Sequence, residues 1–189
     1  MKRLFIATPI IALSPEISQL VEGLQYKLRH DDIVWVKDEV KHLTLRFLGA
    51  TPPQAVAPIR HIMSEVCSNF HPFTLKMNKI GAFGSRYQPK VIWLGFEDFT
   101  PFRALFNEME MKLQSAGFEP NYGNFVPHLT LCRVKSTHSK DKFWHAVEEA
   151  SDAVTGQEIR IDQLNLYQSF LHKEGPEYKV LFSSKLGAK

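Results

Sequence analysis

The sequence has little cysteine, no strong excess of one charge and no long apolar run. Its 189 residues include two cysteines, Cys67 and Cys132, too few for a disulfide framework, so we expect a reducing, cytoplasmic location. The formal net charge of +3 tolerates a phosphate-bearing partner but argues against a large, purely electrostatic nucleic-acid surface. Because no window approaches ~18 consecutive apolar residues, we expect no transmembrane helix and no membrane association.

The residues that are present suit one globular unit. The sequence is 44% hydrophobic and 23% charged, as in soluble globular proteins. A chain of this length can bury roughly 70% of its unfolded surface. The N-terminal stretch MKRLFIATPIIAL is predicted to form a buried strand, because Thr8 and Pro9 interrupt its apolar run, with a signal peptide as the alternative. No linker divides the chain, so residues 1–189 are expected to form a single domain.

Apolar periodicity predicts strands alternating with helices. Helices are expected at 15–28, 52–67, 100–117 and 140–150, and strands at 3–8, 33–36, 43–48, 73–77, 91–96, 128–131, 159–167 and 178–182. The segment 81–89 (GAFGSRYQP) is expected to be a loop. The same succession runs twice along the chain. It predicts an α+β, bilobal, pseudo-twofold fold in which two antiparallel sheets face a central cleft, with helices on the outer faces.

The tetrapeptide HLTL occurs at 42–45 (KHLTLRFLG) and again at 128–131 (PHLTLCRVK). Alternate side chains of a strand share a face, so His42, Thr44 and Arg46 are predicted on one face and the leucines on the other. His128 and Thr130 are predicted to share the corresponding face in the second copy. Core packing explains the leucines, but it does not require histidine and threonine at the same two positions twice. The repeat therefore indicates a functional site.

Two imidazoles and two hydroxyls that converge across a cleft have a definite chemistry. Histidine titrates near neutral pH, so one ring can accept a proton while the other donates one. Threonine hydroxyls can hydrogen-bond the oxygens of a phosphate. Together these groups can open a phosphodiester without a metal. Two alternatives stay open: HLTL as an ordinary half-buried strand, and a zinc site, for which two histidines still need a third ligand that no HxxxH pair or cysteine cluster supplies.

Two HxT motifs on strands of a bilobal fold resemble the signature of the two-histidine (2H) phosphoesterases. The similarity extends to the bacterial RNA 2′,3′-cyclic phosphodiesterases, historically called 2′-5′ RNA ligases. Besides HLTLRFLG, the segments that resemble this family, in its order, are RLFIATPI, GAFGSRYQPKVIWLGF, NFVPHLTLCRV and LNLYQSFLHKEGPEYKVL. One HxT carries no weight, whereas this ordered set spans nearly the whole chain.

The resemblance implies a 2H phosphoesterase domain over residues 1–189, made of two intertwined lobes with one HxT motif in each. It implies hydrolysis of RNA 2′,3′-cyclic phosphate ends to 2′-phosphates without metal or cofactor, with reversible 2′-5′ ligation as a secondary reaction. His42 is then the general acid that protonates the departing 3′ oxygen, and His128 is the general base that activates water. Thr44 and Thr130 hold the phosphate oxygens. The implied partners are RNA 3′ ends, with no obligate protein partner, and we expect a monomer.

One departure from the family concerns the residue before the second motif's proline. Many relatives carry a basic or polar residue where this chain has Val126. Arg46 is a candidate to replace it as a substrate contact, and the alternative is that Arg46 reaches only solvent. Cys132 is expected to be a small residue on the floor of the site and not a nucleophile.

Other functions and residues remain as alternatives. The same fold can serve a phosphodiesterase for 2′-5′ oligoadenylate or small cyclic nucleotides, or a non-catalytic nucleotide- or RNA-binding module, which the intact pair of HxT motifs disfavours. Aromatic side chains can stack on bases, although core packing is the expected role for any one of them. The candidates are Phe5, Trp93, Tyr122, Phe125 and Tyr167.

Overall fold

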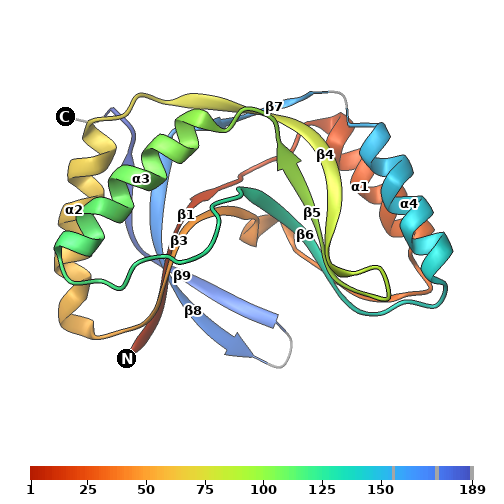
Figure 1. Ribbon diagram of the computed structural model, residues 1–189, viewed down its shortest axis with the longest axis horizontal. Helices are drawn as coiled ribbons and strands as arrows, with labels where there is room; N and C mark the ends of the chain where they lie inside the picture. The colour runs from red at the N-terminus through yellow and green to blue at the C-terminus, as the bar shows by residue number, and fades with distance from the viewer. Residues whose placement is uncertain (155, 173–174, 188–189) are drawn as a thin grey trace.

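Short β-rich runs and amphipathic helices build one large antiparallel sheet with helices along its outer side (Figure 1). The structure is a computed structural model that describes residues 1–154, 156–172 and 175–187. The strands are β1 Lys2–Pro9, β2 Asp32–Trp35, β3 His42–Thr51, β4 Phe73–Ser85, β5 Gln88–Phe96, β6 His128–Ser136, β7 Glu158–Ile161, β8 Gln163–His172 and β9 Gly175–Lys185. Across these residues they form a nine-stranded sheet in the order β7-β4-β5-β6-β3-β1-β8-β9, with β2 paired to β6.

The two halves of the sheet meet at β3 and β6, the strands that carry the two HLTL copies. β3 pairs with β1 and β6 pairs with β5, while β3 and β6 join through Leu43 opposite Leu129. The α+β class and the two-part antiparallel plan are confirmed, and the two expected sheets are continuous. The sheet bends into an arch around this joint (Figure 1), so both histidine-bearing strands lie at its centre.

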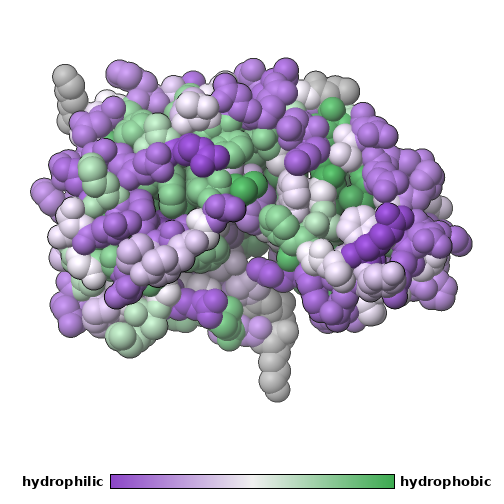
Figure 2. All heavy atoms as spheres, viewed as in Figure 1, coloured by the Kyte–Doolittle hydropathy of each residue, from purple (hydrophilic) through white to green (hydrophobic). Residues whose placement is uncertain are grey.

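Helices cover the convex side of the arch. They are α1 Pro15–Lys27, α2 Val56–Ser68, α3 Thr100–Ser115 and α4 Lys140–Asp152. A 3-10 turn at Asp38–Val40 precedes β3, and another at Pro53–Ala55 precedes α2. Ser14 caps α1 by accepting a hydrogen bond from the Ile17 backbone N–H at 3.3 Å, and Pro15 fits the first turn, where no N–H partner is needed. Figure 2 shows hydrophilic residues around most of the periphery and more hydrophobic ones toward the middle of the view.

The helices exchange halves. α1 follows β1 in the chain, yet it packs beside α4, which covers β4 in the other half. Likewise α3 follows β5, yet it packs beside α2 and against β3. Each half of the sheet is therefore covered in part by a helix that follows, in the chain, a strand of the other half. Among the described residues, no helix is both long enough and apolar enough to cross a membrane.

The expectation of a loop at 81–89 is wrong, because β4 and β5 form one long hairpin through this segment. Its glycines are typical of a turn, but here they serve the strand. Gly84 has φ +108° at a bulge opposite Pro89, a conformation that favours glycine. At Gly81 an added Cβ would lie 2.6 Å from Cζ2 of Trp93, so glycine is needed for that indole to lie against β4. The hairpin extends one wall of the arch beside the second HLTL strand.

Candidate active site

His42 and His128 each begin a strand, and each ring is held in the same way. Nδ1 of His42 is 2.8 Å from the carbonyl oxygen of Val40, and Nδ1 of His128 is 3.0 Å from that of Val126. A carbonyl can only accept, so Nδ1–H donates and Nε2 is the nitrogen left to exchange a proton. The contact at Val126 uses its backbone, so the loss of a polar side chain there leaves the histidine's support intact.

His42 lies in an aromatic pocket built by β1, β8 and β9. Its ring centroid is 5.0 Å from that of Phe5, 5.2 Å from that of Tyr178 and 6.2 Å from that of Tyr167. Burial lowers the pKa of His42; the Val40 carbonyl opposes this by favouring the charged ring, and the positive charges of His128 and Arg133 lower the pKa further. The charge on His128 therefore affects the pKa of His42, as is expected of two rings that share one site.

His128 has a different environment on β6. The ring of Phe83 meets it edge to face at 4.9 Å, and the ring of Trp93 lies 6.5 Å away. The fold thus gives two equivalent histidines unequal surroundings: an enclosed aromatic pocket for His42 and a more open wall for His128.

The two threonines accompany their histidines as the alternation predicted. Thr44 lies opposite Ala7 of β1, and Thr130 lies opposite Trp93 of β5. Both are half-buried, and within the described residues no hydrogen bond occupies either hydroxyl. Each hydroxyl is therefore free to bond an oxygen of a ligand on the concave side.

A β-bulge follows Thr44 and overturns the expected position of Arg46. Thr44 pairs with Ala7 and Arg46 with Ile6, the next residue of β1, so Leu45 is the inserted residue. The bulge turns Arg46 toward the helices and brings Phe47 to the concave side, with its ring 5.9 Å from that of Phe5. The prediction that Arg46 shares a face with His42 and Thr44 is wrong.

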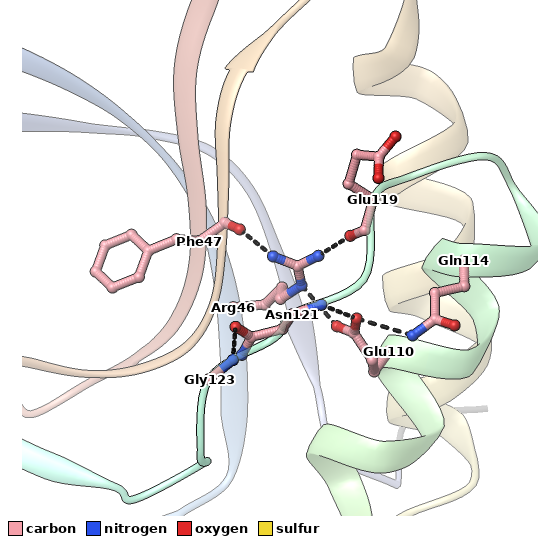
Figure 3. Close-up of polar contacts among 7 residues, drawn as sticks. All are labelled: Arg46, Phe47, Glu110, Gln114, Glu119, Asn121 and Gly123. Atoms are coloured by element: carbon pink, nitrogen blue, oxygen red, sulfur yellow. Dashed lines mark hydrogen bonds and ion pairs between the residues drawn. The ribbon is translucent and has the colours of Figure 1, made fainter.

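The guanidinium of Arg46 is committed to other partners (Figure 3). Nε donates to Oε2 of Glu110 on α3 at 2.6 Å, and the two terminal nitrogens donate to the carbonyl oxygens of Phe47 and Glu119. The Arg46 and Glu110 side chains are only 10% and 11% exposed. In Figure 3 the ring of Phe47 projects away from this guanidinium. Arg46 therefore fastens β3 to α3 and to the segment leading to β6, and it leaves the set of candidate substrate contacts.

A second bulge follows Thr130. Thr130 pairs with Trp93 and Cys132 with the preceding residue Ile92, so one residue of β6 is again inserted. Cys132 consequently lies in the hydrophobic core, where burial raises the pKa of its thiol to about 12, and it is no part of the site's floor. The same bulge places Arg133 opposite Val91, exposed on the concave side.

Arg133 is a site residue that the strict alternation missed. Its charge lowers the pKa of His42, and together with Arg3 it opposes the rise in the pKa of Tyr178 that burial causes. Because its charge acts on both His42 and Tyr178, Arg133 supplies a positive charge at the candidate site that can bind an anion. Arg133 is the fifth residue after His128, as Phe47 is after His42, and that spacing was the available signal.

The candidate stacking residues separate into three groups. Phe5 and Tyr167 line the pocket of His42, and Trp93 lies beside His128. Phe125 packs against Phe106 of α3, with centroids 4.2 Å apart, and is a core residue. Tyr122 is 87% exposed and belongs neither to the site nor to the core. As for the zinc alternative, no cluster of three or more His, Cys, Asp or Glu side chains that fits a metal ion occurs in the described part of the chain.

Comparisons with known proteins show the family to which the chain is related. Residues 11–93 and 98–178 match the family described as LigT like Phosphoesterase. The RNA 2′,3′-cyclic phosphodiesterase of Thermotoga maritima is 32% identical over 181 residues, which cover 95% of this chain and 93% of the relative. The crystal structure of TT0787 of Thermus thermophilus has a TM-score of 0.79 at 24% identity, and that of Escherichia coli LigT complexed with 3′-AMP has 0.69 at 22%; each match covers 99% of both chains. The resemblance noted in the sequence is confirmed: the chain belongs to the LigT-like family of 2H phosphoesterases.

Proposed function

We propose that this protein hydrolyses 2′,3′-cyclic phosphates at RNA 3′ ends to 2′-phosphates, without a metal or cofactor. The observation that carries the proposal is the matched presentation of His42 and His128, with Nδ1 of each bonded to a carbonyl and Nε2 left free. The name of the Thermotoga maritima relative, and the 3′-AMP in the Escherichia coli neighbour, support the substrate class. We also infer that the chain acts as one domain of two intertwined lobes and as a monomer in the cytoplasm.

The reaction needs one neutral and one charged imidazole. Nε2 of His128 takes a proton from water while the water oxygen attacks phosphorus. The bond from phosphorus to O3′ breaks, and the charged His42 gives its Nε2 proton to O3′. Each transfer is worth about 10²–10⁴ in rate. The pKa of His42 is lowered in the free protein, and a bound phosphate anion would favour its charged, acidic form.

Four further side chains suit the substrate. The hydroxyls of Thr44 and Thr130 donate to the non-bridging phosphate oxygens, and Arg133 balances the developing negative charge. Phe47 is 63% exposed and supported from behind by the ring of Phe5, so a base can stack on its open face.

The test is turnover of a short RNA that ends in a 2′,3′-cyclic phosphate, with EDTA present and the product assigned by phosphorus NMR. We expect a 2′-phosphate product, and we expect His42→Ala and His128→Ala each to lower turnover by at least about 10²-fold. His61→Ala, on the exposed side of α2, is the matched control. A fully active His42 or His128 variant would refute the two-histidine mechanism, and turnover abolished by EDTA would identify the rings as metal ligands.

The same assay separates the competing functions. Faster turnover of 2′-5′ oligoadenylate or of a small cyclic nucleotide than of the cyclic-phosphate RNA would reassign the substrate while keeping the chemistry. Tight binding of RNA without turnover of any of these compounds would favour a binding module.

A further inference from the structure

Two tyrosines line the pocket of His42, and their hydroxyls are used differently. Tyr167 of β8 and Tyr178 of β9 hold their ring centroids 6.2 Å and 5.2 Å from that of His42. The Tyr167 hydroxyl accepts a hydrogen bond from Nδ2 of Asn165 at 2.9 Å, and both residues are buried. The Tyr178 hydroxyl has no hydrogen bond within the described residues, and it is not a buried atom. It is therefore free to bond a ligand.

The bend of the sheet brings Tyr178 to the histidine. β9 is the last strand on its side of the sheet, separated from β3 by β8 and β1. On a flat sheet three strand spacings, about 14 Å, would lie between the two strands. The ring of Tyr178 nevertheless meets that of His42 at 90°, and its centroid lies 5.1 Å from that of Phe5. A residue that is remote in the order of strands thus forms a wall of the His42 pocket.

Packing against a histidine does not require the hydroxyl. In the other half of the molecule, Phe83 meets the ring of His128 edge to face, with centroids 4.9 Å apart and an angle of 89°. This contact has nearly the same geometry as that between Tyr178 and His42, and it is made by a ring that carries no oxygen. The oxygen on Tyr178 therefore needs a reason other than the support of His42.

The electrostatics of the phenol connect it to the place where an anion would bind. Burial raises the pKa of Tyr178, so at neutral pH the phenol keeps its proton and can donate a hydrogen bond. The charges of Arg133 and Arg3 oppose that rise, and the charge of Arg133 also lowers the pKa of His42. Arg133 comes from β6, in the opposite half of the sheet, and its charge acts on both residues. A phosphate that lies between Arg133 and His42 is therefore close to the Tyr178 hydroxyl.

We propose that Tyr178 is a further catalytic residue, whose hydroxyl donates a hydrogen bond to a non-bridging oxygen of the reacting phosphate. This inference rests on the function proposed above. When the water oxygen bonds to phosphorus, negative charge grows on the non-bridging oxygens, and a donor that is already in place stabilises that charge. The phenol keeps its proton throughout, so His128 still takes the proton of water and His42 still protonates O3′. Tyr178 adds a donor on the leaving-group side of the phosphate.

Tyr178→Phe tests the assignment because it removes the hydroxyl and keeps the ring. We expect kcat for cyclic-phosphate RNA to fall by about 10²-fold, as for the loss of one donor to a developing oxyanion, with KM changed by less than about twofold. The loss should be the same on ribose 2′,3′-cyclic phosphate, because the contact is to the phosphate and not to the base. The thermal unfolding midpoint should stay as it is, since the described residues give the hydroxyl no partner in the free protein. Tyr26→Phe, at a 68% exposed position on α1, is the matched control.

Sulfur substitution in the substrate locates the contact. The two diastereomers of adenosine 2′,3′-cyclic phosphorothioate each replace one non-bridging oxygen with sulfur, which is a weak hydrogen-bond acceptor. Tyr178→Phe should cost about 10²-fold on the diastereomer that keeps the contacted oxygen, and less than about threefold on the other, whose contact is already weakened. Equal losses on both diastereomers would overturn a contact to one non-bridging oxygen.

The remaining outcomes separate this inference from the function on which it rests. An unchanged kcat in Tyr178→Phe, beside normal turnover by the unaltered protein, would overturn the role of Tyr178 and leave the proposed function standing. A loss confined to KM and to substrates with a base would also overturn it, because the hydroxyl would then contact the base. A loss matched by a lower unfolding midpoint would show that the hydroxyl only supports the fold. Absence of turnover by the unaltered protein would overturn the proposed function and the role of Tyr178 with it.

Discussion

Phe47 and Arg133 occupy equivalent positions in the two halves of the molecule. Each is the fifth residue after the histidine of its motif, and each reaches the concave side because a bulge follows the motif's threonine. The structural repeat therefore extends beyond the four identical residues of HLTL. At its fifth position after the histidine it carries an aromatic side chain in one copy and a cationic side chain in the other. A ring in one half and a cation in the other give the concave side of the sheet two unlike groups at equivalent positions, which suits an asymmetric ligand that carries a base and a phosphate.

Replacement of Arg133 should slow the reaction more than it weakens binding. Arg133→Ala removes a cation whose charge acts on His42, and we expect kcat/KM to fall by about 10²–10³, as for the loss of one group that stabilises developing charge. Arg133→Lys should recover only part of this loss, since an ammonium lacks the paired donors of a guanidinium. Steady-state kinetics on cyclic-phosphate RNA would measure both. Arg160→Ala, at an exposed position on β7, is the control, and equal losses in the two alanine variants would contradict the assignment.

Replacement of Phe47 should reveal a base contact. Phe47→Ala is expected to lower kcat/KM by about tenfold for a nucleotide substrate, mainly through KM, while Phe47→Trp retains a stacking face. The effect should disappear with ribose 2′,3′-cyclic phosphate, which has no base to stack. Tyr87→Ala, at the exposed tip of the β4–β5 hairpin, should leave both substrates unaffected. A loss of the same size on the base-free substrate would show that Phe47 acts on the reaction centre itself.

The repeated HLTL was sufficient to predict that two strands each present a histidine and a threonine on the same face. Strict alternation then failed just past each threonine, at Arg46 and at Cys132, for one physical reason. An inserted residue exchanges the two faces of a strand, and nothing in the letters LRF or LCR marks an insertion. Only the tertiary structure shows that the Arg46 guanidinium has a carboxylate to meet on the helix side.

The hairpin of β4 and β5 could not be predicted from the sequence for a related reason. Glycine normally indicates a turn, so Gly81 and Gly84 favour a loop when only the sequence is considered. In the structure Gly81 makes room for the ring of Trp93, and Gly84 accommodates a bulge. Both needs arise from a neighbouring strand, which local sequence patterns do not contain.

The titration of His42 should depend on its partner across the cleft. NMR is expected to give His42 a pKa below 6.5 in the free protein, because burial opposes the charged ring. His128→Gln should raise that pKa, since the charge on His128 lowers it. The unfolded chain protonates this side chain below about pH 6.5, whereas the folded protein resists, so the free energy of unfolding should fall as the pH drops through that value. His145→Gln, on the exposed side of α4, should leave the titration where it is; an unmoved pKa in the His128 variant would show that the rings do not interact.

The Arg46–Glu110 pair should govern stability and not substrate affinity. Arg46→Ala leaves a mostly buried carboxylate without its cation, so we expect the free energy of unfolding to fall by about 3 kcal/mol. Arg46→Met combined with Glu110→Leu should cost less, because neither charge is then left unpaired. Burial works to raise the pKa of Glu110, but the hydrogen bond from the Asn121 N–H, with its other partners, holds the pKa below 4.5. Its stabilisation is therefore complete above about pH 4.5 and is lost as the pH falls through the lower folded pKa.

Urea unfolding at neutral and acid pH would measure these differences, and kinetics on the folded variants would test the role in binding. The guanidinium lies on the helix side of β3, so KM for cyclic-phosphate RNA should change by less than about twofold in Arg46→Ala. A large rise in KM with little loss of stability would restore Arg46 as a substrate contact. That outcome would require the strand to lose its bulge when substrate binds, because only without the inserted Leu45 does Arg46 share a face with His42.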